Sequence, residues 1–328
     1  MKLIPAIMQA LFHDDFYLIG DKKAILSYSW ANEKNVKVIN NQTPIYSVSE
    51  QLKWCAINTI QADLFWSPHY NIPLFFSGKQ LVTIHDVFHL AMPQFVGGMH
   101  KRWYAKAMFF MVKEKADRII CGSQFTADEL IRLTGVSPKK ISVIHLGVGH
   151  NWFNIKKEIS PHPKPYLLYV GNVKPHKNLT RLLSAFESLI DIVPHDLVIA
   201  GKKEGFITGD KDVVGKASAL SNRIKFTGFI NEHLLEQYFS HAEALVLPSL
   251  YEGFGLPPLE AMACGCPVIV SNVASLPEVC ADAAIYFDPY KVEDISEKIK
   301  LVIDNEQLRI ELCAKGIERA KQFSWDES

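Results

Sequence analysis

The sequence predicts an α/β protein made of two doubly wound parallel-sheet domains. At 328 residues the chain is long for one hydrophobic core, and two domains of about 150 residues each are expected. Short apolar segments suited to strands alternate along the chain with segments of helical periodicity. This alternation indicates βαβ units, in which parallel strands carry helices on their faces.

The first half opens with a helical segment and then alternates between strands and helices. We interpret residues 1–12 as a helix and not as a signal peptide, because Pro5 and Gln9 interrupt the apolar run and no small-residue cleavage site follows. Ser123 is expected to be the N-cap of the helix after it. Strands of one parallel sheet are expected near 16–19, 36–39, 63–66, 80–84, 117–120 and 141–144, with helices near 48–61, 99–115 and 123–134.

A polar stretch marked by prolines, residues 151–164, separates the two halves. It predicts an N-terminal domain of residues 1–150 and a C-terminal domain of residues 151–328. Six strands alternating with helices predict a doubly wound sheet in the C-terminal domain. These strands are expected at 166–170, 196–200, 224–227, 244–248, 267–270 and 284–287.

The stretch Ser249–Glu260 follows the fourth strand of that sheet and carries the most chemical information. A glycine-bearing loop leads into a short helix with Pro258 in its first turn and Gly265 just past its end. A strand, a glycine loop and a helix start in this order direct backbone N–H groups at an anion. Because Gly253 and Gly255 lack a Cβ, a phosphate could approach the backbone closely.

Two carboxylates bracket this loop, Glu252 before it and Glu260 in what we expect to be the first turn of the helix. Carboxylates repel phosphates but accept hydrogen bonds from neutral hydroxyls. A diphosphate with a polyol on each side, as in a nucleotide sugar, would satisfy both features. The spacing is equally compatible with an ordinary turn whose Glu is stabilised by the helix dipole.

The segment Glu252-Gly-Phe-Gly-Leu-Pro-Pro-Leu-Glu260 resembles the E-x7-E signature of GT4-type retaining glycosyltransferases. The following Ala261–Asn272 and Leu276-Pro-Glu278 continue the pattern, and Tyr169–Asn178 resembles the segment with the donor-phosphate lysine. The resemblance is closest to bacterial mannosyltransferase-like group 1 enzymes that build surface polysaccharides. It implies the GT-B fold, with two Rossmann-like domains facing a cleft.

The resemblance also implies the reaction and its partners. A hexosyl group, with mannosyl as first candidate, would pass with retention from a nucleoside-diphosphate sugar, with GDP-mannose as first candidate, to a glycan or lipid-linked acceptor. The N-terminal domain would face the acceptor and the C-terminal domain would bind the nucleotide sugar. Neither a metal nor a cofactor is expected. Apart from the resemblance, we expect a cytoplasmic location, with the inner face of the membrane as a candidate place of action.

The resemblance assigns catalytic roles to three residues. Lys177 would neutralise the leaving diphosphate, Glu252 would hold the hydroxyls of the donor sugar, and His85, at the end of strand 80–84, would face that sugar. Glu260 would accept from the ribose hydroxyls. The donor-binding set implied is Gly171, Asn172, Lys177, Glu252, Gly253, Phe254, Gly255, Leu256 and Glu260.

The sequence departs from the family pattern in two places. Asn172 stands where many members have an arginine, so that Lys174 or His176 would have to supply the second cation. The usual first strand and its glycine-rich loop are not recognisable before Phe16. These departures keep a non-catalytic nucleotide-sugar-binding subunit open as an alternative. A glycoside hydrolase, which also uses two carboxylates, is a further alternative.

The distribution of charge bears on whether the protein binds nucleic acid or a membrane surface. The net charge of zero argues against a dedicated nucleic-acid binder, and residues 1–150 carry 16 Lys/Arg against 11 Asp/Glu. Helix 99–115 is expected to place Arg102, Lys106, Phe109 and Lys113 on one face, which suits either peripheral membrane contact or an ordinary solvated surface.

Metal sites are not expected. The six cysteines are interpreted as buried reduced thiols, because Cys264-Gly-Cys266 lacks the spacing of a zinc site. Asp210-Lys-Asp212 mimics the D-x-D metal motif of other glycosyltransferases, but it lies in a polar loop and not at a strand end.

Overall fold

The computed structural model describes residues 3–45, 47–201, 213, 215, 217, 220 and 222–325. By contacts the chain separates into two compact units, Met1–Thr83 with Trp103–Ile119 and Ile84–Arg102 with Ile120–Ser328. Residues 84–102 and 120–150 therefore pack with the second half of the chain. The predicted domain boundary at residue 150 assigns these two segments to the N-terminal domain instead.

The second unit contains the six-stranded parallel sheet that the sequence predicts. The strand order is β12-β11-β10-β7-β8-β9, the order of a doubly wound sheet. Every residue of β8, β10 and β11 is buried, as expected for strands covered on both faces. The strands are β7 (Tyr166–Val170), β8 (Asp196–Ala200), β9 (Ile224–Gly228), β10 (Ala244–Leu247), β11 (Val268–Ser271) and β12 (Ile285–Phe287).

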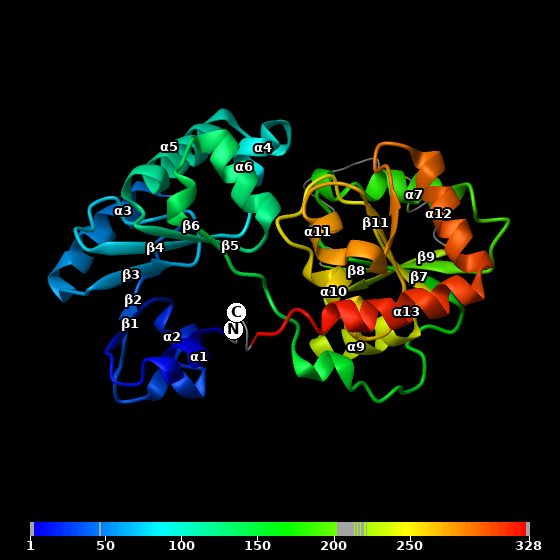
Figure 1. Ribbon diagram of the computed structural model, residues 1–328, viewed down its shortest axis with the longest axis horizontal. Helices are drawn as coiled ribbons and strands as arrows, with labels where there is room; N and C mark the ends of the chain where they lie inside the picture. Colours follow the sequence, from blue (N-terminus) through cyan, green and yellow to red (C-terminus); the bar gives the residue numbers. More distant parts are fainter. Residues whose placement is uncertain are drawn as a thin grey trace. The chain divides into compact units, whose positions relative to one another are not determined.

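Helices cover both faces of this sheet. α7 and α12 pack together on one face, and α9, α10 and α13 lie on the other (Figure 1). α7 buries Leu182, Leu183 and Phe186 on the face predicted from their helical spacing. The helices are α7 (Leu179–Glu187), α9 (Glu232–His241), α10 (Leu256–Ala263), α11 (Leu276–Cys280), α12 (Val292–Asp304) and α13 (Glu306–Ala320), with 3₁₀ turns η5 (His150–Phe153), η6 (Pro175–Lys177) and η8 (Ala281–Ala283).

The first half forms two sheets where one was predicted. β1 (Phe16–Gly20) and β2 (Val36–Asn40) pair in parallel with each other, and β3 (Leu64–Ser67), β4 (Lys79–Ile84), β5 (Arg118–Cys121) and β6 (Ile141–Val143) form a second sheet in that order. The residues of β1 are all half-exposed, whereas alternate residues of β4 are buried. Strand propensity located all six strands, but which strands pair depends on burial that short segments do not encode.

The helices predicted in the first half are present, although the segment 48–61 is α-helical only to Trp54 and continues as a 3₁₀ helix to Ile60. Two short helices, at 22–25 and 88–91, were not predicted. α1 confirms the helical interpretation of the N-terminal segment, and the Ser123 side chain accepts from the Thr126 N–H, which confirms it as an N-cap. The described residues ahead of β1 contain α1 and no strand. The elements are α1 (Leu3–Ala10), α2 (Lys22–Ile25), α3 (Val48–Trp54), α4 (Phe88–Ala91), α5 (Met99–Lys115) and α6 (Gln124–Thr134), with η1 (Ser29–Asn32), η2 (Cys55–Ile60), η3 (Pro93–Phe95) and η4 (Pro138–Lys140).

α5 corrects the predicted distribution of its faces. Phe109 was expected on the basic face, but it is buried and its ring stacks on Tyr70 with centroids 4.6 Å apart. The exposed aromatic residues are instead Trp103 and Phe110, at 68% and 57% exposure. None of the helices in the described part of the chain is long and apolar enough to cross a membrane.

Candidate donor-binding site

The glycine loop follows β10 and leads into α10, as predicted. A Cβ on Gly253 would lie 2.1 Å from the carbonyl oxygen of His85 and 2.8 Å from the Cβ of Asp86. This corrects the expected reason for the glycine, because the space beside its Cα holds the chain that leaves β4 and not a phosphate. The same contact brings His85, whose side chain is exposed, next to the loop.

Gly255 is required for its backbone conformation. Its φ of 115° is one that residues with a Cβ rarely adopt, and it forms the N-cap of α10. Leu256 comes next, followed by two prolines that carry no N–H. Among the described residues, the N–H groups of Gly253, Phe254, Gly255 and Leu256 donate no hydrogen bond. Unpaired N–H groups at a helix start are the donors with which proteins commonly bind anions.

Hydroxyl groups hold the carbonyls of this loop. The Ser275 hydroxyl donates to the carbonyl oxygens of Glu252, at 3.0 Å, and Phe254, at 2.6 Å. The Gly253 carbonyl accepts from the hydroxyls of Ser123, at 2.6 Å, and Thr126, at 3.0 Å. Sequence reasoning found Ser123 as a helix cap but missed this second contact, because the partners are 130 residues apart.

Lys177 and Glu252 form an ion pair. Lys177 Nζ lies 2.6 Å from Glu252 Oε1, and the Ser249 hydroxyl donates to the same oxygen at 2.7 Å. Both charged side chains are largely buried. The predicted cation and the predicted sugar-binding carboxylate are therefore brought together and hold each other in place.

Asn178, directly after the lysine, anchors this loop and was missed as a site residue. Its buried amide donates to the carbonyls of Pro248, at 2.9 Å, and Pro289, at 2.8 Å, and its oxygen accepts from Arg181. Its φ of 59° is left-handed, a conformation that asparagine tolerates better than most residues. An asparagine at a strand-end turn was the available signal.

Glu260 lies one turn deeper in the helix than predicted. It is the fifth residue of α10 and belongs to the second turn, because the helix begins at Leu256. Burial, and secondarily the negative charge of Glu232, raises the pKa of Glu260 to about 7. Its carboxylate has no hydrogen-bond or ion-pair partner within the described residues.

The segment after β7 carries the remaining predicted residues. Gly171 continues the β7 ladder through its N–H to the Ala200 carbonyl, and Asn172 is exposed beside it. His176 is not the second cation, because burial and the neighbouring Lys177 lower its pKa to about 3. Its ring packs on Phe88 with centroids 4.2 Å apart.

The candidate metal motif and the cysteines are the remaining predicted features. Asp210 and Asp212 lie outside the described residues, and no group of three His, Cys, Asp or Glu side chains among the described ones could hold a metal. Burial raises the pKa of Cys121 to about 12, in agreement with an inert thiol. Cys55 corrects the expectation of burial, because it is exposed.

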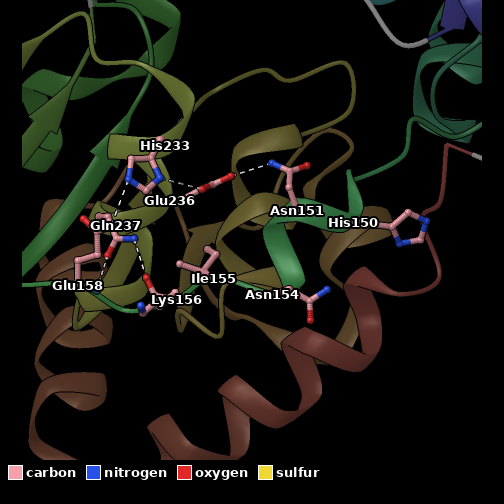
Figure 2. A pocket seen from close by; sticks show the side chains of 9 residues that line it. All are labelled: His150, Asn151, Asn154, Ile155, Lys156, Glu158, His233, Glu236 and Gln237. Carbon is pink, nitrogen blue, oxygen red and sulfur yellow. Dashed lines mark hydrogen bonds and ion pairs between the residues drawn. The ribbon is translucent and has the colours of Figure 1, made fainter.

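A cavity of ≈ 450 Å³ lies between the segment 150–158 and α9, and none of the predicted site residues lines it (Figure 2). Its polar groups bond mainly to one another. The His233 ring lies between Glu158 and Glu236, and Asn151 donates to Glu236 at 2.7 Å and to Glu232 at 3.1 Å. The cavity therefore marks where the chain leading to β7 is fastened to α9.

Solved structures share this architecture. WaaG, a glycosyltransferase involved in lipopolysaccharide biosynthesis, superposes with a TM-score of 0.72 at 16% identity, over 94% of this chain and 95% of that one. Anabaena HepE in complex with UDP-glucose gives a TM-score of 0.74 at 16% identity, with coverage of 94% and 95%. The fold is that of a GT-B glycosyltransferase, which confirms the predicted fold class.

Family comparisons make the assignment narrower. The family "Glycosyl transferases group 1" matches residues 150–323, and "Glycosyltransferase Family 4" matches residues 32–152. The chain belongs to the group 1 glycosyltransferases. The predictions of this family and of a glycosyltransferase activity are confirmed.

Several similar curated proteins are named as mannosyltransferases. O-antigen chain mannosyltransferase B of Escherichia coli is 30% identical over 80% of this chain and 71% of its own length. The serotype-specific mannosyltransferase WbdA of Escherichia coli is 31% identical over 79% of this chain but 33% of its own length. O-antigen chain mannosyltransferase RfbU of Salmonella typhimurium is 30% identical over 72% of this chain and 65% of its own length. The chain thus spans about a third of WbdA and less than two thirds of RfbU.

Proposed function

We propose that this chain transfers a hexosyl group, with mannosyl as first candidate, from a nucleoside-diphosphate sugar to a glycan or lipid-linked acceptor in cell-surface polysaccharide synthesis. One observation carries the proposal. Four unpaired backbone N–H groups, from Gly253 to Leu256, lie at one strand–helix junction with Lys177 and two carboxylates. Cation and amides suit a diphosphate, and the carboxylates suit the hydroxyls on either side of it.

The chemistry then needs no nucleophile from the protein. The bond between the anomeric carbon and the diphosphate oxygen breaks, and the acceptor oxygen bonds to that carbon from the same face. The acceptor proton passes to the departing phosphate oxygen. Lys177 and the loop amides stabilise the charge that develops on the diphosphate. In many enzymes, electrostatic stabilisation of this kind makes the largest contribution to the rate enhancement.

The two alternatives have less support. A glycoside hydrolase would place its acid and its base on opposite sides of the substrate, whereas Glu252 and Glu260 belong to one loop and the helix after it. A non-catalytic binder would keep the same donor site. The relatives named as mannosyltransferases favour transfer, with GDP-mannose as the first donor to test.

The test begins with donor binding. Thermal unfolding is followed with GDP-mannose, UDP-glucose, GDP and UDP in separate samples. A ligand at 100 times its Kd should stabilise the protein by about 2.7 kcal/mol. Turnover is then measured with the ligand that binds, using lipid-linked and free glycans as acceptors, and NMR of the product reports whether the anomeric configuration is retained.

Variants link these results to the site. Lys177→Met and Glu252→Gln should lose turnover, whereas Glu297→Gln, an exposed carboxylate on α12, should behave as wild type. Binding without turnover on every acceptor would favour the non-catalytic alternative. Inversion of configuration, or failure of all four nucleotides to bind, would refute the proposal.

We also propose that the enzyme works at the inner face of the membrane, through the exposed side of α5. Lys106 Nζ lies over the Trp103 ring at 5.5 Å from its centroid, and Phe110 follows two turns after Trp103. Exposed aromatic rings interleaved with lysine are typical of helices that lie on anionic lipid. The excess of basic residues in the first half supports the same contact.

Cosedimentation with vesicles tests this contact. Wild type should bind vesicles of phosphatidylglycerol and phosphatidylethanolamine, and Trp103→Ala with Phe110→Ala should weaken binding at least tenfold. Leu52→Ser, which removes an exposed apolar side chain from α3, is the control. Equal binding to neutral phosphatidylcholine vesicles, or no effect of the double variant, would contradict the proposal.

A further inference from the structure

We propose that Ser123, Thr126 and Glu278 are positioning residues for the donor diphosphate. They hold the N-terminus of α6 against the glycine loop and so fix the direction of the Phe254 N–H. The inference rests on the proposed function, because it takes this N–H as one of the diphosphate ligands.

The first step is the geometry of one peptide unit. The Gly253 carbonyl and the Phe254 N–H belong to the same planar group and point in opposite directions. A carbonyl oxygen has two lone pairs, and here the Ser123 and Thr126 hydroxyls supply two donors to it, at 2.6 and 3.0 Å. With its oxygen held from two directions, this peptide unit cannot rotate without losing both bonds.

The second step concerns the proton of Ser123. Its oxygen accepts from the Thr126 N–H at 3.1 Å, as the N-cap of α6, and its one hydroxyl proton goes to Gly253. Ser123 and Thr126 are both fully buried. Water therefore has no access with which to replace either hydroxyl, and loss of one leaves the carbonyl with a single donor.

The third step is the support of α6 itself. The Glu278 carboxylate accepts from the N–H groups of Gln124, at 2.7 Å, and Phe125, at 2.9 Å. With Ser123 as the cap of Thr126, the first three N–H groups of α6 all have partners. A negative charge at a helix start is also favoured by the helix dipole. Glu278 thus connects α11 to the start of α6, which is where the Ser123 and Thr126 hydroxyls lie.

These contacts form a chain of support that ends at the donor site. Glu278 fixes the start of α6, α6 fixes two hydroxyls, and the hydroxyls fix the peptide before Phe254. On the other side, Ser275 fixes the two neighbouring peptides through the Glu252 and Phe254 carbonyls. Three consecutive peptide units are therefore set before any ligand arrives, which lowers the cost of ordering them on binding.

The test compares ligands that use the loop with one that does not. Affinities for the nucleoside diphosphate and for the matching nucleoside, which reaches only the ribose site, are measured by calorimetry. Ser123→Ala combined with Thr126→Val should weaken diphosphate binding at least tenfold and leave nucleoside binding unchanged. Glu278→Gln should act in the same direction with a smaller effect. A merely structural role would weaken both ligands alike.

Matched variants complete the design. Thr134→Val removes a hydroxyl bond within the same helix, to the Leu130 carbonyl at 2.6 Å, and should leave both affinities unchanged. Thr126→Ser keeps the hydroxyl and should restore binding if Thr126→Val has lost it. Hydrogen exchange of segment 250–262 without ligand should be faster in the double variant than in Thr134→Val, and this readout needs no nucleotide.

The outcomes separate the two proposals. If the wild type binds the diphosphate and the double variant binds it with the same affinity, the positioning role is overturned and the proposed function is not. Parallel losses of diphosphate and nucleoside affinity also overturn it. Failure of the folded wild type to bind any diphosphate overturns the proposed function, and the positioning role falls with it.

Discussion

Replacing Glu260 by glutamine should stabilise the free protein at alkaline pH while weakening its hold on the donor. The fold raises the pKa of this carboxyl to about 7 from its ordinary value of 4.5. The folded state therefore holds a proton between these two pH values that the unfolded chain has lost, and stability falls as pH rises through this window. Glutamine carries no proton to lose and is free of this penalty.

The magnitude follows from the two pKa values. A difference of one pKa unit corresponds to about 1.4 kcal/mol, so the full penalty above pH 7 is about 3 kcal/mol. Glu260→Gln should thus raise the free energy of unfolding by about 3 kcal/mol at pH 8 and by less than about 1 kcal/mol at pH 5.

Donor binding should change in the opposite direction. If the ionised carboxylate accepts from two ribose hydroxyls, its loss should weaken binding by about 1–3 kcal/mol, or roughly 5- to 150-fold. In wild type the ionised fraction falls from about 0.9 at pH 8 to about 0.1 at pH 6, and the Kd for a nucleotide sugar should rise about tenfold. The variant should lack this pH dependence.

Urea unfolding and calorimetry at pH 5, 6 and 8 measure both effects, with Glu297→Gln as the surface control. A nucleotide sugar is the right ligand, because its diphosphate diester does not titrate in this range. Unchanged donor affinity in a folded Glu260→Gln protein would remove Glu260 from the site. A loss of stability at pH 8 would refute the assignment of a raised pKa.

Three further outcomes are expected. Asn178→Ala should lower the free energy of unfolding in urea by about 2–4 kcal/mol, because two buried carbonyls lose their donor and a left-handed residue loses its favourable side chain; a change below about 0.5 kcal/mol would contradict this. Gly253→Ala should abolish donor binding, because its Cβ would meet backbone 2.1 Å away, whereas Gly97→Ala, with no neighbour within 4 Å, should not. Turnover should survive EDTA, and loss of activity restored by Mn²⁺ would implicate Asp210 and Asp212.

The six-stranded sheet and the strand–helix junction that carries the site could be predicted because their information is local. Strand and helix signals alternate along the chain, and parallel βαβ topology brings every strand's carboxyl end to one edge. This placed the lysine loop after β7 and the glycine loop after β10 at the same edge of the sheet. The residues from Glu252 to Glu260 are contiguous, so their grouping needed no knowledge of distant contacts.

Other features were decided by the tertiary structure. The sequence could not show that Lys177 pairs with Glu252, that the half-buried His176 ring is uncharged, or that Phe109 and not Phe110 faces inward. Each depends on which groups exclude water from one another, and desolvation is a property of the packed chain.

The glycine loop shows most clearly which features the sequence determined and which only the tertiary structure decided. The sequence determined that residues 253 and 255 are glycines before a helix, and this was enough to predict an anion site. The structure alone decided why Gly253 is needed and what orients its carbonyl, since those partners come from Ser123, Thr126 and the end of β4, more than 120 residues away. Hydrogen bonds act over about 3 Å, and only the folded chain brings such distant residues within that range.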